Sequence, residues 1–313
     1  MAIDVAQGVC LLSKTGVGIL GNSLLITYYL TSFLLGSKLK PTDQTIIHMA
    51  LVHTVMLLTR WIVTAAGMLG LQLVRNDAEC KLFAYLYRIT WALSICTTFL
   101  LSVVQAITIS PSTSFLFQLK VQIPNAIHPV LAILWIPNSL ISTNLLLQMF
   151  ASSNTPNKNT NRFLMTIDTL LQGLILTFMV LRDILSLGLM SCCSGYMVLL
   201  LHRCRHHVQH LHSPTQAPET SPERRATQTI VLLVSCFVFF YCGDFIFSMF
   251  LGTSMRNNVV LFNANMFVAC GYATISPFVL LTCDRRVIKF LTDFLGNRTL
   301  KSSQTTVLSA SPL

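Results

Sequence analysis

The hydrophobic pattern of the chain is a series of long apolar stretches separated by shorter polar segments. A helix that crosses a bilayer needs about 20 mostly apolar residues. Seven stretches meet this requirement, at residues 16–35, 45–69, 82–109, 126–150, 176–201, 226–252 and 259–283. The pattern therefore predicts an all-α membrane protein, folded as a seven-transmembrane helix bundle.

The fifth apolar stretch, residues 163–201, is too long for one simple span and decides the number of crossings. A break at Arg182-Asp183 would divide it, but no Gly, Pro or Asn lies there to form a turn. With seven spans, the N-terminus outside and the C-terminus cytoplasmic, the cytoplasmic side carries twice as many Lys and Arg residues as the outer side. Since cytoplasmic loops are enriched in these residues, seven spans are favoured. Residues 149–175 then form a large second outer loop.

The composition excludes a soluble globular protein. Only 10% of the residues are charged, 53% are hydrophobic and the mean hydropathy is +0.65, whereas a soluble domain has about 25% charged residues. The net charge of +10 is explained by membrane topology, because no nucleic-acid-binding pattern accompanies the basic residues. No nucleic-acid partner is expected.

Five ionisable residues lie inside the predicted spans, where a charge is costly and usually functional. From the rise of about 1.5 Å per helical residue, all five fall in the outer half of the bilayer. Together with three aromatic residues they form a candidate ligand-binding vestibule: Arg60, Arg88, Trp91, Arg182, Asp183, Tyr241, Asp244 and Phe245. An apolar cavity with a few polar groups suits a small-molecule ligand. The alternative for each charged residue is a structural ion pair, or a side chain that snorkels to the surface.

Basic residues gather at the predicted inner ends of the fifth and sixth spans. They are Arg203, Arg205, Arg224 and Arg225. A basic surface in this position is expected to contact anionic membrane lipid and an intracellular protein partner.

The sequence predicts neither an enzyme nor a cofactor. The His and Cys residues between positions 202 and 212 match no standard zinc-site spacing, so no metal is predicted. No common catalytic or phosphate-binding motif occurs. Asp183 lacks a motif that would pair it with Asp244 as the two aspartates of an intramembrane protease.

Several strings of residues are similar to those of one receptor family, the vomeronasal type 1 receptors. The strings are Lys40-Pro-Thr-Asp43, His48-Met-Ala-Leu51, Leu93-Ser-Ile-Cys-Thr-Thr98, Leu101-Ser-Val-Val-Gln-Ala-Ile-Thr-Ile-Ser-Pro111, Ser194-Gly-Tyr-Met-Val-Leu-Leu-Leu-His202, Val208-Gln-His-Leu-His-Ser213, Arg225-Ala-Thr-Gln-Thr-Ile230, Tyr241-Cys-Gly-Asp-Phe-Ile-Phe-Ser248 and Gly271-Tyr-Ala-Thr-Ile-Ser-Pro-Phe278. The resemblance extends from the first span to the start of the tail.

The resemblance implies a G-protein-coupled receptor of the plasma membrane that detects pheromones or other small chemical cues. It further implies an inhibitory-class heterotrimeric G protein as the partner. Residues 1–290 are then the seven-transmembrane receptor domain, and residues 291–313 are a short cytoplasmic tail. The alternatives are a bitter-taste-type receptor and a membrane transporter or channel. Against a transporter, the charges lie outward and no internal repeat is visible.

One cysteine departs from what the resemblance implies. The family usually joins the position of Cys80 to a cysteine of the second outer loop, but residues 149–175 contain none. Cys80 therefore has no evident loop partner, and Cys10 is the only other cysteine expected to face outward.

Overall fold

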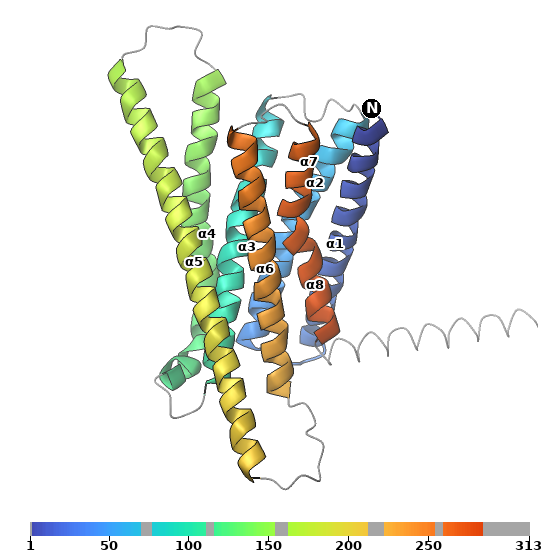
Figure 1. Cartoon of the computed structure of the whole chain (residues 1–313), viewed down its shortest axis with the longest axis vertical. Helices are drawn as coiled ribbons and strands as arrows, with labels where there is room; N and C mark the ends of the chain where they lie inside the picture. The colour runs from blue at the N-terminus through green and yellow to red at the C-terminus, as the bar shows by residue number, and fades with distance from the viewer. Residues whose placement is uncertain are drawn as a thin grey trace, which may run out of the picture.

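The computed structural model describes residues 2–69, 77–110, 116–153, 162–211, 222–253 and 259–283. These residues form eight α-helices. Figure 1 shows that their axes are roughly aligned. The helices are α1 (Ala2–Leu34), α2 (Pro41–Leu69), α3 (Asp77–Ile109), α4 (Leu116–Ser153), α5 (Arg162–Leu211), α6 (Pro222–Thr253), α7 (Val259–Ala269) and α8 (Gly271–Cys283). The tail predicted at residues 291–313 lies outside the described residues.

Six helical segments in this part of the chain are long and apolar enough to cross a membrane. They are Val5–Leu34, Pro41–Leu69, Lys81–Ile109, Gln118–Thr143, Val180–Leu200 and Ala264–Thr282, the last of which joins α7 to α8. In α6 the apolar segment is shorter and comprises Val231–Asp244. Because lipid offers no hydrogen bonds to the backbone, a helical bundle is the form that such segments adopt in a membrane.

The prediction of a large outer loop at residues 149–175 was wrong for most of these residues. Helix α4 continues to Ser153 and α5 already begins at Arg162. The membrane-capable segment of α5 has 21 residues, but the helix has 50. No proline occurs within α5, so no residue forces the helix to end at the membrane boundary. In Figure 1 both ends of α5 extend beyond α1, α2 and α3.

The predicted seventh span is divided into α7 and α8 by a turn at Cys270. The division lies N-terminal to Pro277, which is inside α8. Helix α1 binds carbonyl groups on both sides of the division: the Lys14 ammonium donates to the Phe267 carbonyl, and Asn22 Nδ2 donates to the Ala273 carbonyl at 3.0 Å. In an unbroken helix the Ala273 carbonyl would accept from residue 277, and proline has no N–H to give. Asn22 therefore supplies the missing donor.

Replacing Asn22 by Ala should lower the free energy of unfolding by about 1–3 kcal/mol, the cost of a buried polar group left without a partner. The measurement is thermal unfolding of the purified chain in detergent. Ser23→Ala is the matched control, since Ser23 is the next residue of α1 and is exposed. Equal unfolding midpoints for the two variants would show that the bond from Asn22 does not stabilise the fold.

Gly271 starts α8 where another helix comes close. A Cβ at this position would lie 2.1 Å from the Phe240 ring of α6, well inside van der Waals contact. The absence of a side chain thus lets Phe240 pack directly on the backbone beside the turn at Cys270. This close approach couples α6 to the junction between α7 and α8.

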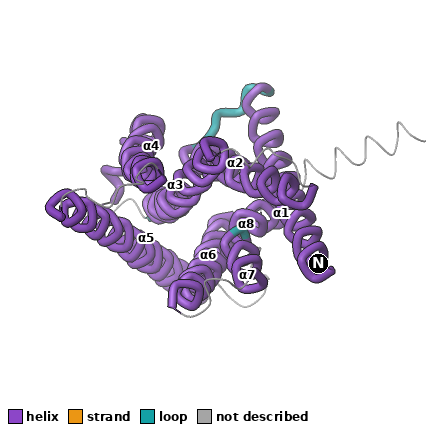
Figure 2. Tube along the Cα trace, turned by 90° about the horizontal axis from the view of Figure 1, so that it is seen from above, coloured by secondary structure: helices purple, strands orange, loops and turns teal. Residues whose placement is uncertain are grey.

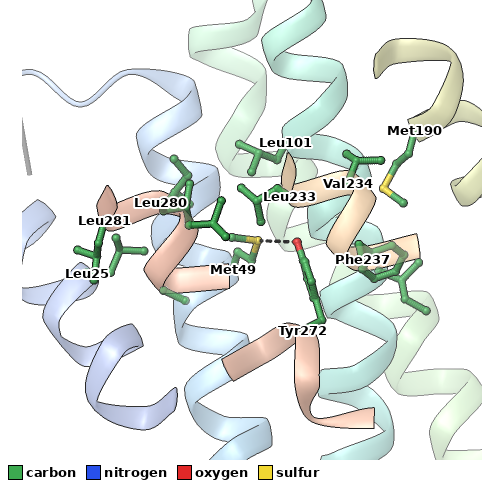
Figure 3. Packing of buried hydrophobic residues seen from close by; sticks show 14 of the residues in the cluster. Leu25, Met49, Leu101, Met190, Leu233, Val234, Phe237, Tyr272, Leu280 and Leu281 are labelled. Atoms are coloured by element: carbon green, nitrogen blue, oxygen red, sulfur yellow. Dashed lines mark hydrogen bonds between the residues drawn. The ribbon is translucent and has the colours of Figure 1, made fainter. Parts of the chain in front are cut away.

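The core is centred on α3, which packs against α2, α4, α5 and α6. Figure 2 shows α1 and α5 on opposite sides of the bundle, with α3 between them. In Figure 3 the side chains of Met49, Leu233, Phe237 and Tyr272 converge from α2, α6 and α8. In the most apolar 18-residue segment of α3, 67% of the residues are buried. In the corresponding segments of α4 and α5, only 22% are buried. The apolar outer surface of α4 and α5 is therefore the surface suited to lipid.

Candidate functional site

Helices α4, α5 and α6 are joined by a polar cluster on Arg182 and Asp183. Two guanidinium nitrogens of Arg182, Nε and Nη2, donate to Asp183 Oδ1 at 2.9 and 2.7 Å. Its Nη1 donates to Asn138 Oδ1 at 2.6 Å, and the Tyr241 hydroxyl donates to Asp183 Oδ2 at 3.4 Å. Arg88 of α3 lies within electrostatic range of both charges. Arg182 and Asp183 thus form an ion pair with each other.

Arg60 and Asp244 lie on the other side of this region, on α2 and α6. The Arg60 guanidinium carbon is 3.6 Å from the centroid of the Tyr87 ring, a cation–π contact with α3. Arg60 Nε is buried and has no hydrogen-bond partner. Asp244 is partly buried and feels the charge of Arg60, but the two side chains form no ion pair in the described structure.

A row of aromatic rings connects these polar groups to the core. Trp91 of α3 stacks on Tyr241 with their ring centroids 5.9 Å apart. Tyr241 stacks in turn on Phe237 at 5.9 Å, and Phe237 meets the edge of Tyr272 at 4.9 Å. The Tyr241 ring is therefore in contact with both Trp91 and Phe237, and its hydroxyl donates to Asp183.

These rings line a cavity between α2, α3, α6, α7 and α8. The space in it that the centre of a water-sized sphere can reach is about 20 Å³, and all of the empty space up to and including the open mouth is about 350 Å³. The lining residues are Met56, Trp91, Ser94, Ile95, Phe237, Phe240, Tyr241, Asp244, Ala269, Tyr272 and Ala273. This is the mostly apolar type of wall, with a few polar groups, that small-molecule sites have.

The structure brings three of the predicted vestibule residues, Trp91, Tyr241 and Asp244, into the lining of the cavity. The predicted arginines and Asp183 are not among its lining residues. Phe240 and Phe237 were not predicted, although they precede Asp244 by about one and two helical turns, respectively, and so share its face of α6. That spacing is the signal in the sequence that could have identified them.

A buried histidine, also not predicted, lies directly behind the cavity wall. His53 Nε2 is 2.7 Å from Ser94 Oγ of α3, and His53 Nδ1 is 3.0 Å from Ser276 Oγ of α8. The His53 side chain is fully buried, and its ring meets the edge of the Tyr272 ring at 5.3 Å. His53 thus joins α2, α3 and α8 through both ring nitrogens, and its partner Ser94 is itself a lining residue.

Several predicted residues cannot be placed in this way. The side chains of Phe245, Cys80, Arg205, Arg224 and Arg225 lie outside the described residues. Arg203 is described and is exposed near the C-terminal end of α5, and Cys10 is a free, exposed cysteine. Among the described residues, no group of three or more His, Cys, Asp or Glu side chains is arranged to hold a metal ion.

Comparison with known proteins gives a consistent result along nearly the whole chain. Residues 5–293 match the vomeronasal organ pheromone receptor family. Vomeronasal type-1 receptor 45 of Mus musculus is 36% identical over 287 residues, which cover 89% of this chain and 89% of the relative. Vomeronasal type-1 receptor 100 of Rattus norvegicus is also 36% identical, over 89% of this chain and 86% of its own length. Vomeronasal type-1 receptor 1 of Gorilla gorilla gorilla is 33% identical, over 91% of this chain and 82% of its own.

Proposed function

Since this chain belongs to the vomeronasal type 1 receptor family, we propose that it detects a pheromone or another small chemical cue and activates an inhibitory-class heterotrimeric G protein. It is a multi-pass membrane protein and a chemosensory receptor, not an enzyme. Membership of this family argues against the two alternatives, a bitter-taste-type receptor and a transporter or channel.

The proposed topology has seven spans in the plasma membrane, with the N-terminus outside and the C-terminus in the cytoplasm. The twofold excess of Lys and Arg on the cytoplasmic side supports this orientation. Arg203 and Arg205 then lie near the inner end of α5, and Arg224 and Arg225 lie at the start of α6. These four arginines form the surface proposed to face the G protein and the anionic inner lipid.

The observation that carries the proposal is the convergence of Trp91, Tyr241 and Asp244 on one cavity. These three residues come from α3 and α6, and the opposite wall comes from α2, α7 and α8. A ligand in this cavity contacts helices on both sides of the bundle. We assign Arg60, Arg88, Arg182, Asp183 and Phe245 to the surroundings of this site, where the first four set the charge near its walls.

In the proposed mechanism, a ligand that occupies the cavity changes the packing of the helices. A ligand shifts the receptor only if it binds the active packing more tightly than the resting packing. The cavity touches Ala269, Tyr272 and Ala273, which flank the turn at Cys270, and Phe240, which packs on Gly271. Ligand contacts at this place act on α6 and on the α7–α8 junction together. Movement of α6 would carry Arg224 and Arg225 at its inner end.

Replacing Trp91 by Ala should weaken the response to an active cue by about 10- to 100-fold, the range of losses found when a tryptophan that contributes strongly to binding is removed. The measurement is ligand-stimulated nucleotide exchange on the G protein in membranes that contain the receptor. A defined panel of volatile ketones, alcohols, amines and steroids supplies the cues. Trp61→Ala is the matched control, because Trp61 is 41% exposed and is not among the lining residues.

Surface labelling of an N-terminal tag, with a C-terminal tag as the inner reference, shows that each variant reaches the membrane in the proposed orientation. Access to the C-terminal tag in intact cells would contradict the topology. An unchanged response of the Trp91 variant to every active cue would remove the cavity as the ligand site.

A further inference from the structure

Asp244 is the only Asp, Glu, Lys, Arg or His among the residues that line the cavity. Within the described structure it forms neither a hydrogen bond nor an ion pair. The contrast with Asp183 is clear, because that carboxylate is bound by the Arg182 guanidinium and the Tyr241 hydroxyl. One of the two intramembrane carboxylates is thus already neutralised by its neighbours, and the other faces a cavity.

The rest of the wall provides the second element of a cation site. Five lining residues are aromatic, namely Trp91, Phe237, Phe240, Tyr241 and Tyr272. The face of an aromatic ring attracts a cation, and indole attracts it most strongly. An ammonium group with apolar substituents is therefore matched by these rings around it and by the Asp244 carboxylate.

The basic residues of the region are occupied elsewhere, which makes the cavity unsuited to an anion. Arg60 lies over the Tyr87 ring, and Arg182 is bound to Asp183 and Asn138. Lys14 donates to the Phe267 carbonyl and lies over the Phe267 ring at 3.5 Å. None of the three is a lining residue. An anionic group in the cavity would lie near Asp244 with no lining cation to offset the repulsion.

We propose that the cavity selects an organic ammonium ion, whose charged nitrogen pairs with Asp244 and whose apolar body packs against Trp91, Tyr241 and Phe237. This inference rests on the proposed function, since it names the class of ligand for that same cavity. In an environment of low dielectric constant a charge-assisted hydrogen bond is about twice as strong as a neutral one. Arg60 lies within electrostatic range of Asp244 but forms no ion pair with it in the described structure, so an ammonium ion has no bound partner to displace.

The test uses the full chain in lipid nanodiscs and two matched series of probes. Each series keeps one apolar body, phenylethyl or adamantyl, and carries an amine, an alcohol or a carboxylate. In the wild type we expect the amine of at least one series to bind at least about 10-fold more tightly than its alcohol and its carboxylate. Asp244→Asn should weaken amine binding by about 10- to 100-fold and leave alcohol binding within about threefold. Asp244→Glu should keep the preference for the amine.

The matched control is Asp43→Asn, which makes the same substitution at the start of α2, where the carboxylate accepts from the Lys40 backbone N–H and is not among the lining residues, and it should keep the preference for the amine. Binding that favours the carboxylate, binding of amines that is the same in Asp244→Asn, or no binding by any amine overturns the inference.

Nucleotide exchange on the G protein, measured with the same probes, separates this inference from the proposed function. Amines that bind through Asp244 but activate no G protein would overturn the receptor mechanism and leave the ligand class standing. Activation by alcohols or carboxylates, without preference for amines, would overturn the ligand class and leave the receptor mechanism standing.

Discussion

Replacing Arg182 by Met is expected to lower the free energy of unfolding by about 3–5 kcal/mol, the cost of breaking one side of a buried ion pair. The side chains of Arg182 and Asp183 are only 15% and 8% exposed. Without the guanidinium, Asp183 keeps a single hydrogen bond, the 3.4 Å contact from the Tyr241 hydroxyl. Asn138 Oδ1 also loses its donor at 2.6 Å, so the variant leaves unpaired groups on both α4 and α5.

The double variant Arg182→Met, Asp183→Asn decides whether this loss comes from the uncompensated charge. Removing both members of a buried pair is often nearly neutral, so the double variant should be more stable than Arg182→Met alone. Denaturant unfolding in detergent of the two single variants and the double variant gives the coupling energy of the pair. Additive losses would show that the charges do not interact in the folded protein, whatever their distance.

The sequence predicts that this is a membrane protein because membrane insertion depends on the overall hydrophobicity of each span. A span must be apolar over the thickness of the bilayer, and its backbone must be satisfied internally, whatever its neighbours are. The ends of the helices depend instead on local signals. Residues 162–175 contain no proline to end α5, and the apolar pattern cannot distinguish a helix that continues past the membrane from a loop.

The candidate site could be predicted in part, for a similar reason. Asp244 is visible in the sequence because a charge inside a span is costly and therefore informative. Phe237 and Phe240 line the same cavity, but apolar residues in a span face a cavity, a neighbouring helix or lipid with equal ease. Their roles become clear only when α6 is packed against α3 and α8. The seventh span is likewise divided next to the place where Phe240 packs on Gly271, a contact that the sequence pattern does not show.

His53 was not predicted because it is not one of the charged residues that stand out inside a predicted span. A neutral histidine has one ring nitrogen that donates and one that accepts, so a histidine inside a span does not carry the cost that marks an arginine or aspartate. Its two partners, Ser94 and Ser276, are separated from it along the sequence by 41 and 223 residues. No local spacing connects the three. Only the packing of α2, α3 and α8 brings them together.

Replacing His53 by Leu should lower the free energy of unfolding by about 2–4 kcal/mol, since two buried hydroxyl groups lose their partner in a single step. A leucine fills a similar volume, so the loss comes from the hydrogen bonds more than from a cavity. Ser276→Ala removes only one of the two contacts and should cost about half as much. Unfolding of the purified chain in detergent measures both variants under the same conditions.

His53→Gln separates the hydrogen bonds of His53 from its shape, because glutamine keeps one donor group and one acceptor group. If the contacts to Ser94 and Ser276 hold α8 against α2 and α3, glutamine should restore most of the stability that leucine loses. We also expect His53→Leu to change the basal rate of nucleotide exchange on the G protein, because Ser94 lines the cavity and Ser276 lies beside Pro277 in α8. Glutamine should restore this basal rate. A variant that regains stability but not the basal rate would show that the histidine ring itself, through its edge contact with Tyr272, sets the resting packing. Equal losses for Leu and Gln in both measurements would contradict a role for the two hydrogen bonds.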